Sequence, residues 1–321
     1  MSLATHAWSY EDVGRGEVAN LAVLDTLVYA TAADDGVIIL SLNSGVTVGT
    51  MPPPVGTESI DDVAIAGMRL FVLDAVAPGH LSVFSLADPL RPRLIGTSRA
   101  VPVGPFSGVS AADGLVMVSG GTSELTAWAL DTSGALRGPI ATGDLGRGQP
   151  DVAVAPGGRV AYVSTHYRGP AFGLDVVLVD TTTRSVEPLA RLPLQGAGFT
   201  DGGARPSSFP IVASVHDEHT VLVAHGRGVA VIDAVNPEAP RLTAVLDVGG
   251  AATHVHVLHD TAAVVIAGPS PAVALIDLSV VPARVFRRLP LAPGTFPLGV
   301  VLAPSRIVVA IRHQGTVIFD R

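Results

Sequence analysis

The side chains best suited to chemistry near neutral pH in this sequence are histidines accompanied by arginines and carboxylates. An imidazole can exchange a proton at that pH, and a guanidinium group can hold an anionic substrate. His166, His225 and His254 are the candidates for acid–base catalysis. The candidates for substrate binding are Asp62, Asp151, Tyr167, Arg168, Phe172, Phe199, Arg205, Arg227, His256, Arg312 and His313.

A structural role competes with each of these assignments, because a single polar residue defines no converging geometry. His254 and His256 lie two residues apart and therefore on one side of a strand, where a satisfied pair is the simpler interpretation. A further set of aspartates recurs at strand ends and is expected to serve in turns. This set is Asp74, Asp131, Asp180, Asp233 and Asp277.

The residue types that are missing exclude several classes of chemistry. The sequence has no lysine and no cysteine, which removes Schiff-base chemistry, thiol nucleophiles, disulfides and cysteine-ligated zinc. No nucleophile elbow, zinc-protease motif, phosphate-binding loop or dinucleotide fingerprint is present. We therefore predict no cofactor and assign no metal ligands, with a divalent metal held by imidazole and carboxylate groups as the open alternative.

Charge and hydropathy narrow the range of partners. The chain has 20 basic and 28 acidic residues, a net charge of −8, and no arginine-dense stripe, which argues against a nucleic-acid partner. The apolar stretches are short and interrupted by Gly, Pro or Asp, so we expect no membrane partner. The N-terminal residues lack a secretory signal pattern, and a cytoplasmic location is expected unless a leader has been removed.

A repeated strand pattern predicts the fold. A short apolar strand with a polar end recurs at intervals of roughly 45 residues, the length of a propeller blade. Its copies end at Ser41, Ser85, Asp131, Asp180, Asp233, Asp277 and Asp320. The sequence therefore predicts an all-β, seven-bladed β-propeller with four-stranded antiparallel blades.

One domain over residues 1–321 is expected. Its blades should start near residues 18, 59, 107, 150, 209, 253 and 297. The chain stops directly after the third strand of the last blade, so residues 7–14 are expected to supply the outer strand of that blade and close the ring.

Three segments resemble the repeats of LVIVD-repeat and YVTN-type bacterial seven-bladed β-propellers. Ser85–Thr97 and Ile232–Val245 resemble the LVIVD connection between third and fourth strands, with its paired prolines. Val152–Thr165 resembles the first two strands of a YVTN repeat. The resemblance implies the propeller fold. It implies no particular activity, because these families share none.

In such a ring, the connections between second and third strands and those between successive blades lie at one end, which we call the top face. Two of these connections, around His166–Leu174 and Gln195–Ser208, are longer than their counterparts, as is common on the binding face of a repeat protein. We predict a small-molecule ligand at the top face and an enzyme of the lyase, isomerase, cyclase or lactone-hydrolase type. The alternative is a non-catalytic binding module for a ligand or a protein partner.

Overall fold

The computed structural model describes residues 6–8, 20–32, 35–54, 57, 60–74, 76, 79–101, 108–112, 114–120, 124–145, 151–165, 173–194, 213–216, 219–226, 228–312 and 315–321. All regular elements within these residues are β-strands. No helix that could cross a membrane occurs in this part of the chain. The predicted all-β class is therefore confirmed.

The strands follow one another as antiparallel sets of four, which we number as units 1 to 7. Unit 1 contains β2 (Leu21–Leu24), β3 (Leu27–Thr31), β4 (Val37–Ser41) and β5 (Thr47–Met51). Unit 2 contains β6 (Asp62–Ala66), β7 (Arg69–Asp74), β8 (Gly79–Ser85) and β9 (Arg93–Val101). Unit 3 contains β10 (Gly108–Ala112), β11 (Leu115–Ser119), β12 (Glu124–Leu130) and β13 (Leu136–Asp144). Unit 4 contains β14 (Asp151–Val154), β15 (Val160–Thr165), β16 (Gly173–Asp180) and β17 (Ser185–Pro193).

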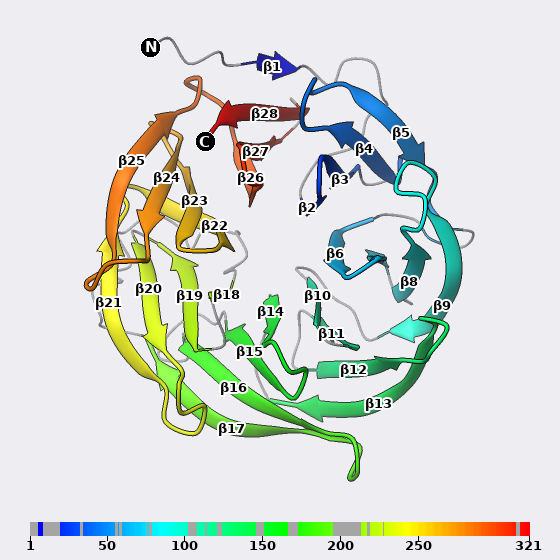
Figure 1. Cartoon of the computed structure of the whole chain (residues 1–321). Coiled ribbons are helices and arrows are strands. Elements are labelled where there is room, and N and C mark those ends of the chain that lie inside the picture. The colour runs from blue at the N-terminus through cyan, green and yellow to red at the C-terminus, as the bar shows by residue number, and fades with distance from the viewer. Residues whose placement is uncertain are drawn as a thin grey trace.

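The remaining units complete the circle in Figure 1. Unit 5 contains β18 (Ala213–His216), β19 (Thr220–His225), β20 (Gly228–Asp233) and β21 (Arg241–Asp247). Unit 6 contains β22 (Ala251–Leu258), β23 (Thr261–Ala267), β24 (Ala272–Asp277) and β25 (Arg284–Pro290). Unit 7 contains β26 (Pro297–Leu302), β27 (Arg306–Ile311) and β28 (Gly315–Asp320), together with β1 (His6–Trp8).

Units 3 and 4 share one eight-stranded sheet, a difference from the seven separate sheets expected. The described strands thus form six hydrogen-bonded sheets. The two units are joined by one parallel pair, Thr142 with Ser185, on their outer strands β13 and β17. Gly143 permits this approach, because a Cβ atom there would lie 2.3 Å from the Val186 carbonyl oxygen.

In units 1 to 6 the first strand lies nearest the centre of the ring and the fourth strand lies outermost, and in unit 7 β26 is innermost and β1 outermost (Figure 1). These inner strands contact one another in a closed cycle, from β2 through β6, β10, β14, β18, β22 and β26 back to β2. The second and third strands are packed between neighbouring units, which explains their nearly continuous apolar sequences. Within the described residues, each of seven hydrophobic clusters joins two consecutive units, including unit 7 with unit 1.

The polar residues that end most of the third strands organise the turns that follow. Asp180, Asp233 and Asp277 each accept a hydrogen bond from the backbone N–H two residues later, at 2.7–3.0 Å. Asp131 does the same at 2.8 Å. Hydrogen bonds lower the pKa of three of these carboxyl groups, because they favour the ionised carboxylate. The largest contribution comes from the Ser133 hydroxyl for Asp131, from the Ser279 hydroxyl for Asp277 and from the Thr182 N–H for Asp180. The turn role predicted for these aspartates is confirmed.

The N-terminal strand β1 is the outermost strand of unit 7. It pairs antiparallel with β28, with Ala7 opposite Val317 and Trp8 opposite Thr316. It begins at His6 rather than at the expected residue 7, and residues 9–14 lie outside the described residues. The first and last strands of the chain are therefore hydrogen-bonded neighbours in one sheet.

Candidate functional site

Asp62, a predicted substrate-binding residue, is the first residue of the inner strand β6. Its Oδ1 accepts a hydrogen bond from the N–H of Val63 at 2.8 Å. Its Oδ2 accepts one from the N–H of Val109, in the inner strand of the next unit, at 2.7 Å. The carboxyl group therefore bridges units 2 and 3.

The electrostatic setting of Asp62 is unusual for a carboxyl group. Burial raises its pKa to about 7, and the nearby Asp61 acts in the same direction. The two backbone N–H groups oppose this effect without cancelling it. Asp62 thus titrates near neutral pH while both of its oxygens are already hydrogen-bonded.

His254 and His256 lie on the inner strand β22 and face the next unit in the same way. Nδ1 of His254 accepts a hydrogen bond from the N–H of Val300 at 3.4 Å. Nδ1 of His256 accepts one from the N–H of Leu302 at 3.2 Å. Both donors belong to β26 of unit 7, so the two imidazoles bridge units 6 and 7.

This contact fixes the protonation state of both rings. A backbone N–H can only donate, so Nδ1 must carry a lone pair and the ring proton must be on Nε2. Burial lowers the pKa of His254 to about 3, and the neighbouring His256 adds to that effect. Burial lowers the pKa of His256 to about 4. Both imidazoles are therefore neutral at pH 7 and act as hydrogen-bond acceptors.

Two neutral side chains continue the same arrangement elsewhere in the ring. Oγ of Ser110, on β10, accepts a hydrogen bond from the N–H of Val154 in unit 4 at 3.0 Å. Asn20, just before β2, donates from its side-chain amide to the carbonyl oxygen of Asp61 in unit 2 at 2.7 Å. Polar side chains near the starts of inner strands thus bind the backbone of the following unit. The sequence analysis did not identify Ser110 or Asn20, because each bond joins residues about one repeat apart.

Asp151 and Arg312 are the other candidates whose side chains are described. Oδ1 of Asp151, at the start of β14, accepts a hydrogen bond from the N–H of Val152 at 2.9 Å, as Asp62 does from Val63. Arg312 follows β27 at the top face and is exposed. Its guanidinium carbon lies 5.6 Å from the centroid of the Phe296 ring, which is a cation–π contact at an exposed site.

The remaining candidates cannot be placed in a common site. His225 is the last residue of β19, and only its backbone is described. The other candidates lie outside the described residues: His166, Tyr167, Arg168, Phe172, Phe199, Arg205, Arg227 and His313. Among those described, Asp62 belongs to unit 2 and the two histidines to unit 6, and their inner strands are not neighbours in the ring.

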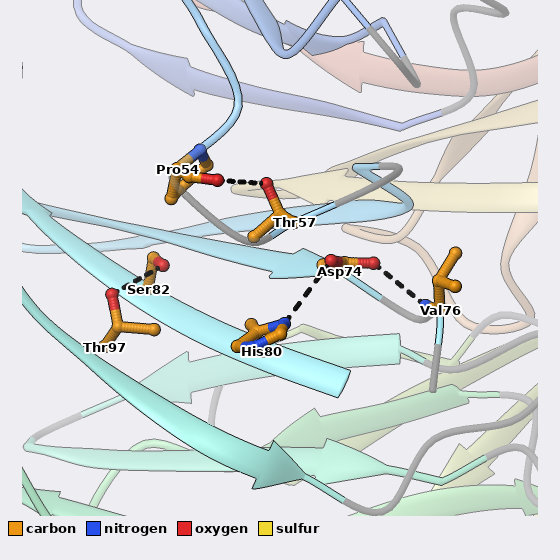
Figure 2. A network of polar contacts seen from close by, with 7 residues as sticks. All are labelled: Pro54, Thr57, Asp74, Val76, His80, Ser82 and Thr97. Carbon is orange, nitrogen blue, oxygen red and sulfur yellow. Dashed lines mark hydrogen bonds and ion pairs between the residues drawn. The ribbon is translucent and has the colours of Figure 1, made fainter. Parts of the chain in front are cut away.

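An imidazole–carboxylate contact that the sequence analysis missed lies in unit 2 (Figure 2). Nδ1 of His80 lies 3.5 Å from Oδ2 of Asp74, whose side chain is 2% exposed. Asp74 also accepts a hydrogen bond from the N–H of Val76 at 2.9 Å. Asp74 and His80 are directly opposite in the β7–β8 ladder. Their positions on either side of one short connection were the available sequence signal.

The described residues contain no group of three or more His, Cys, Asp or Glu side chains placed to hold a metal ion. The described candidate residues fall into two groups, those that bind the protein's own backbone and those that are exposed. Asp62, His254 and His256 bind the backbone of a neighbouring unit, whereas Arg312 is exposed at the top face.

The comparisons with known proteins bear on the fold. No family model matches the chain, and no curated protein sequence does. The hydrazine synthase of Kuenenia stuttgartiensis is similar in structure, with a TM-score of 0.69 and 13% identity over 95% of each chain. The computationally designed Ika8 protein has a TM-score of 0.61 and 13% identity, over 95% of this chain and 83% of that chain. Together with the ring of antiparallel sheets, these similarities define a β-propeller-like fold.

Proposed function

We propose that this protein is a seven-bladed propeller of the LVIVD/YVTN repeat type that binds an anionic small molecule at its top face without converting it. Units 1 to 7 would be the blades. The single parallel residue pair between β13 and β17 would be a local contact between two of them.

One observation carries the non-catalytic part of the proposal. Asp62 and His254, together with His256, already accept backbone hydrogen bonds from the following unit. A general base needs a lone pair directed at the substrate, and the pKa values of about 3 and 4 are low for a base working near pH 7. These three side chains are better explained as parts of the ring.

The environment of Arg312 supports the proposal that the ligand is anionic. Arg312 is exposed, and its contact with Phe296 restricts the orientation of the guanidinium group before a ligand arrives. A guanidinium group can donate two parallel hydrogen bonds to a carboxylate or phosphate. We therefore assign Arg312 as the anchor for the negative group of the ligand.

An enzyme of the lyase, isomerase, cyclase or lactone-hydrolase type is the second candidate. The observation in its favour is the carboxyl group of Asp62, whose pKa of about 7 suits proton transfer near neutral pH. The two hydrogen bonds that occupy its oxygens count against this candidate.

A thermal-shift screen against anionic metabolites tests the proposal. A ligand that raises the melting temperature of the wild-type protein should bind Arg312→Ala at least about tenfold more weakly, since a hydrogen bond to a charged group contributes about 1.5–3 kcal/mol. Arg159→Ala is the matched control, because Arg159 is exposed in the β14–β15 turn at the opposite end of the ring. Its affinity should equal that of the wild type.

Two results would contradict the proposal. Equal weakening by both substitutions would remove Arg312 as the anchor. If mass spectrometry detected conversion of the bound ligand over hours, the enzyme would be favoured over the binding module.

A further inference from the structure

The outer strand of unit 6 concentrates positive charge in an acidic protein. The chain has a net charge of −8, yet β25 reads RVFRRLP and carries Arg284, Arg287 and Arg288 with no acidic residue. The described outer strands β13, β17 and β21 each contain one arginine and one acidic residue, and β5 has no charged residue. The strand β9 has two arginines and no acidic residue. With three arginines and no acidic residue, β25 is therefore the most positive of the described outer strands.

These arginines lie on both faces of the strand. Arg287 is opposite Leu275 of β24, which packs in the hydrophobic cluster shared with unit 7. Arg288 is opposite Ala274, which packs in the cluster shared with unit 5. Arg284 is 69% exposed and lies 3.8 Å from Asp277, an exposed-edge ion pair of small energy. A segment lying along this edge would meet positive charge above and below its own plane.

The edge of β25 is also open for strand pairing. Within the described residues β25 pairs only with β24 and is the last strand of its sheet, on the outer rim in Figure 1. An edge strand presents backbone N–H and C=O groups to any extended chain that can lie beside it. Edge arginines protect against association with neutral or basic strands, but they attract an acidic one.

Exposed apolar side chains accompany the arginines. Phe286 is 52% exposed in the middle of β25, and Val281, in the preceding turn, is 99% exposed. Phe286 occupies the bulge between Val285 and Arg287, where the outer strand has one residue more than its partner. An exposed aromatic side chain flanked by arginines is the composition enriched at the centres of protein interfaces.

We propose that β25 binds an extended acidic segment of a partner protein, which adds as a strand to the open edge of unit 6. Backbone hydrogen bonds would provide the pairing, as in other cases of strand addition. Arg284 and Arg287 would contact acidic side chains on one face and Arg288 on the other, with an apolar residue of the partner against Phe286. This surface is separate from the top face and does not depend on the ligand proposed there.

The test uses fluorescence polarisation with a labelled, glutamate-rich peptide of about ten residues that has two central valines, matching a typical strand length. The wild-type protein should bind it. The triple substitution Arg284→Glu, Arg287→Glu and Arg288→Glu should weaken binding at least tenfold, because like charges then face each other across the pairing. Phe286→Ala should weaken it by a smaller factor.

The matched control places the same change in charge elsewhere. Arg93→Glu, Arg137→Glu and Arg241→Glu alter exposed arginines on three other outer strands and should leave the affinity within about twofold of the wild type. A peptide of identical charge with alternate backbone amides methylated should lose binding, since it cannot pair along an edge.

Four outcomes would overturn the proposal. These are no binding by the wild type, equal loss in the control triple variant, and undiminished binding of the methylated peptide. The fourth is a wild-type dimer in light scattering that the β25 triple substitution dissociates, because the edge would then be occupied by a second copy of the chain.

Discussion

At the scale of single residues, the inner strands explain why polar side chains are tolerated so close to the core. Asp62, Ser110 and the two histidines of β22 each accept a hydrogen bond from the backbone of the next unit. A buried N–H left without a partner costs about 1–3 kcal/mol, so each acceptor stabilises the contact between two units. Because these acceptor atoms are already hydrogen-bonded, they are not available to act on a substrate.

The two histidines predict a specific dependence of stability on acid. Their pKa values are about 3 and 4 in the folded protein and near 6.5 in the unfolded chain, which therefore binds protons first as the pH falls. As the pH falls from about 6.5 to about 4, the free energy of unfolding should decrease by at most about 1.4 kcal/mol per pH unit for each imidazole. Denaturant titrations over this range measure the slope.

Replacement by asparagine isolates this effect. The Oδ1 atom of asparagine takes the position of Nδ1, so His254→Asn with His256→Asn keeps two acceptors but removes the titration. The double variant should have a shallower slope between pH 6.5 and pH 4. His259→Asn is the control, since His259 is an exposed turn residue with a positive φ of 51° that asparagine tolerates. A slope unchanged in the double variant would contradict the assignment.

Asp62 predicts the opposite dependence. Its pKa is about 7 in the folded protein against 3.8 normally, so its contribution to stability is complete below pH 3.8 and is lost as the pH rises through 7. Asp62→Asn removes the titration and replaces one acceptor oxygen by a donor. It should therefore cost most at or below pH 3.8, about 1–3 kcal/mol, and progressively less as the pH rises to 7 and above.

Ser110→Ala serves as the comparison for Asp62→Asn. It removes an acceptor from the equivalent contact between units 3 and 4 without changing any charge. Its cost should be the same at pH 5 and pH 8. If the cost of Asp62→Asn were equally constant, the pKa shift of Asp62 would be refuted.

At the scale of strands, the role of β1 can be tested directly by deletion. It contributes three residues to unit 7 and covers the edge of β28. Deletion of residues 1–8 should uncover that edge, lower the melting temperature by several degrees and promote association, because an uncovered edge pairs with other chains. Differential scanning calorimetry and light scattering measure both effects.

Addition of the missing segment in trans provides the control for this deletion. A peptide of residues 1–14 should restore part of the lost melting temperature, whereas the same peptide with proline at position 7 should not. A truncated protein as stable and as monodisperse as the full chain would contradict the role of β1.

Strand positions were accessible from the sequence to different degrees. The third strands β4, β8, β16, β20, β24 and β28 end at the predicted Ser41, Ser85, Asp180, Asp233, Asp277 and Asp320. Both faces of these strands are covered by neighbouring units, so their apolar runs stand out in the sequence. The starts of the inner strands were less accessible from the sequence, because their polar residues resemble those of turns.

At the scale of the whole molecule, the ring explains why the candidate site was harder to predict than the fold. The spacing of His254 and His256 shows that they share one side of a strand, but it does not show which side. Their partners, Val300 and Leu302, lie one unit further along the chain. The union of β13 with β17 was equally inaccessible, because it depends on the absence of a side chain at Gly143.

The pairing of β1 with β28 has a consequence for the synthesis of the protein. A ribosome releases β1 early and its partner strand only after all the intervening units, which takes on the order of tens of seconds at about 5–20 residues per second. During that time the other units can form, but the seam between first and last strands stays open. A nascent chain that stops before Gly315 lacks β28, the strand with which β1 pairs. The backbone groups of β1 that would bond to β28 are then unpaired, and chaperones and proteases can bind such an unpaired strand.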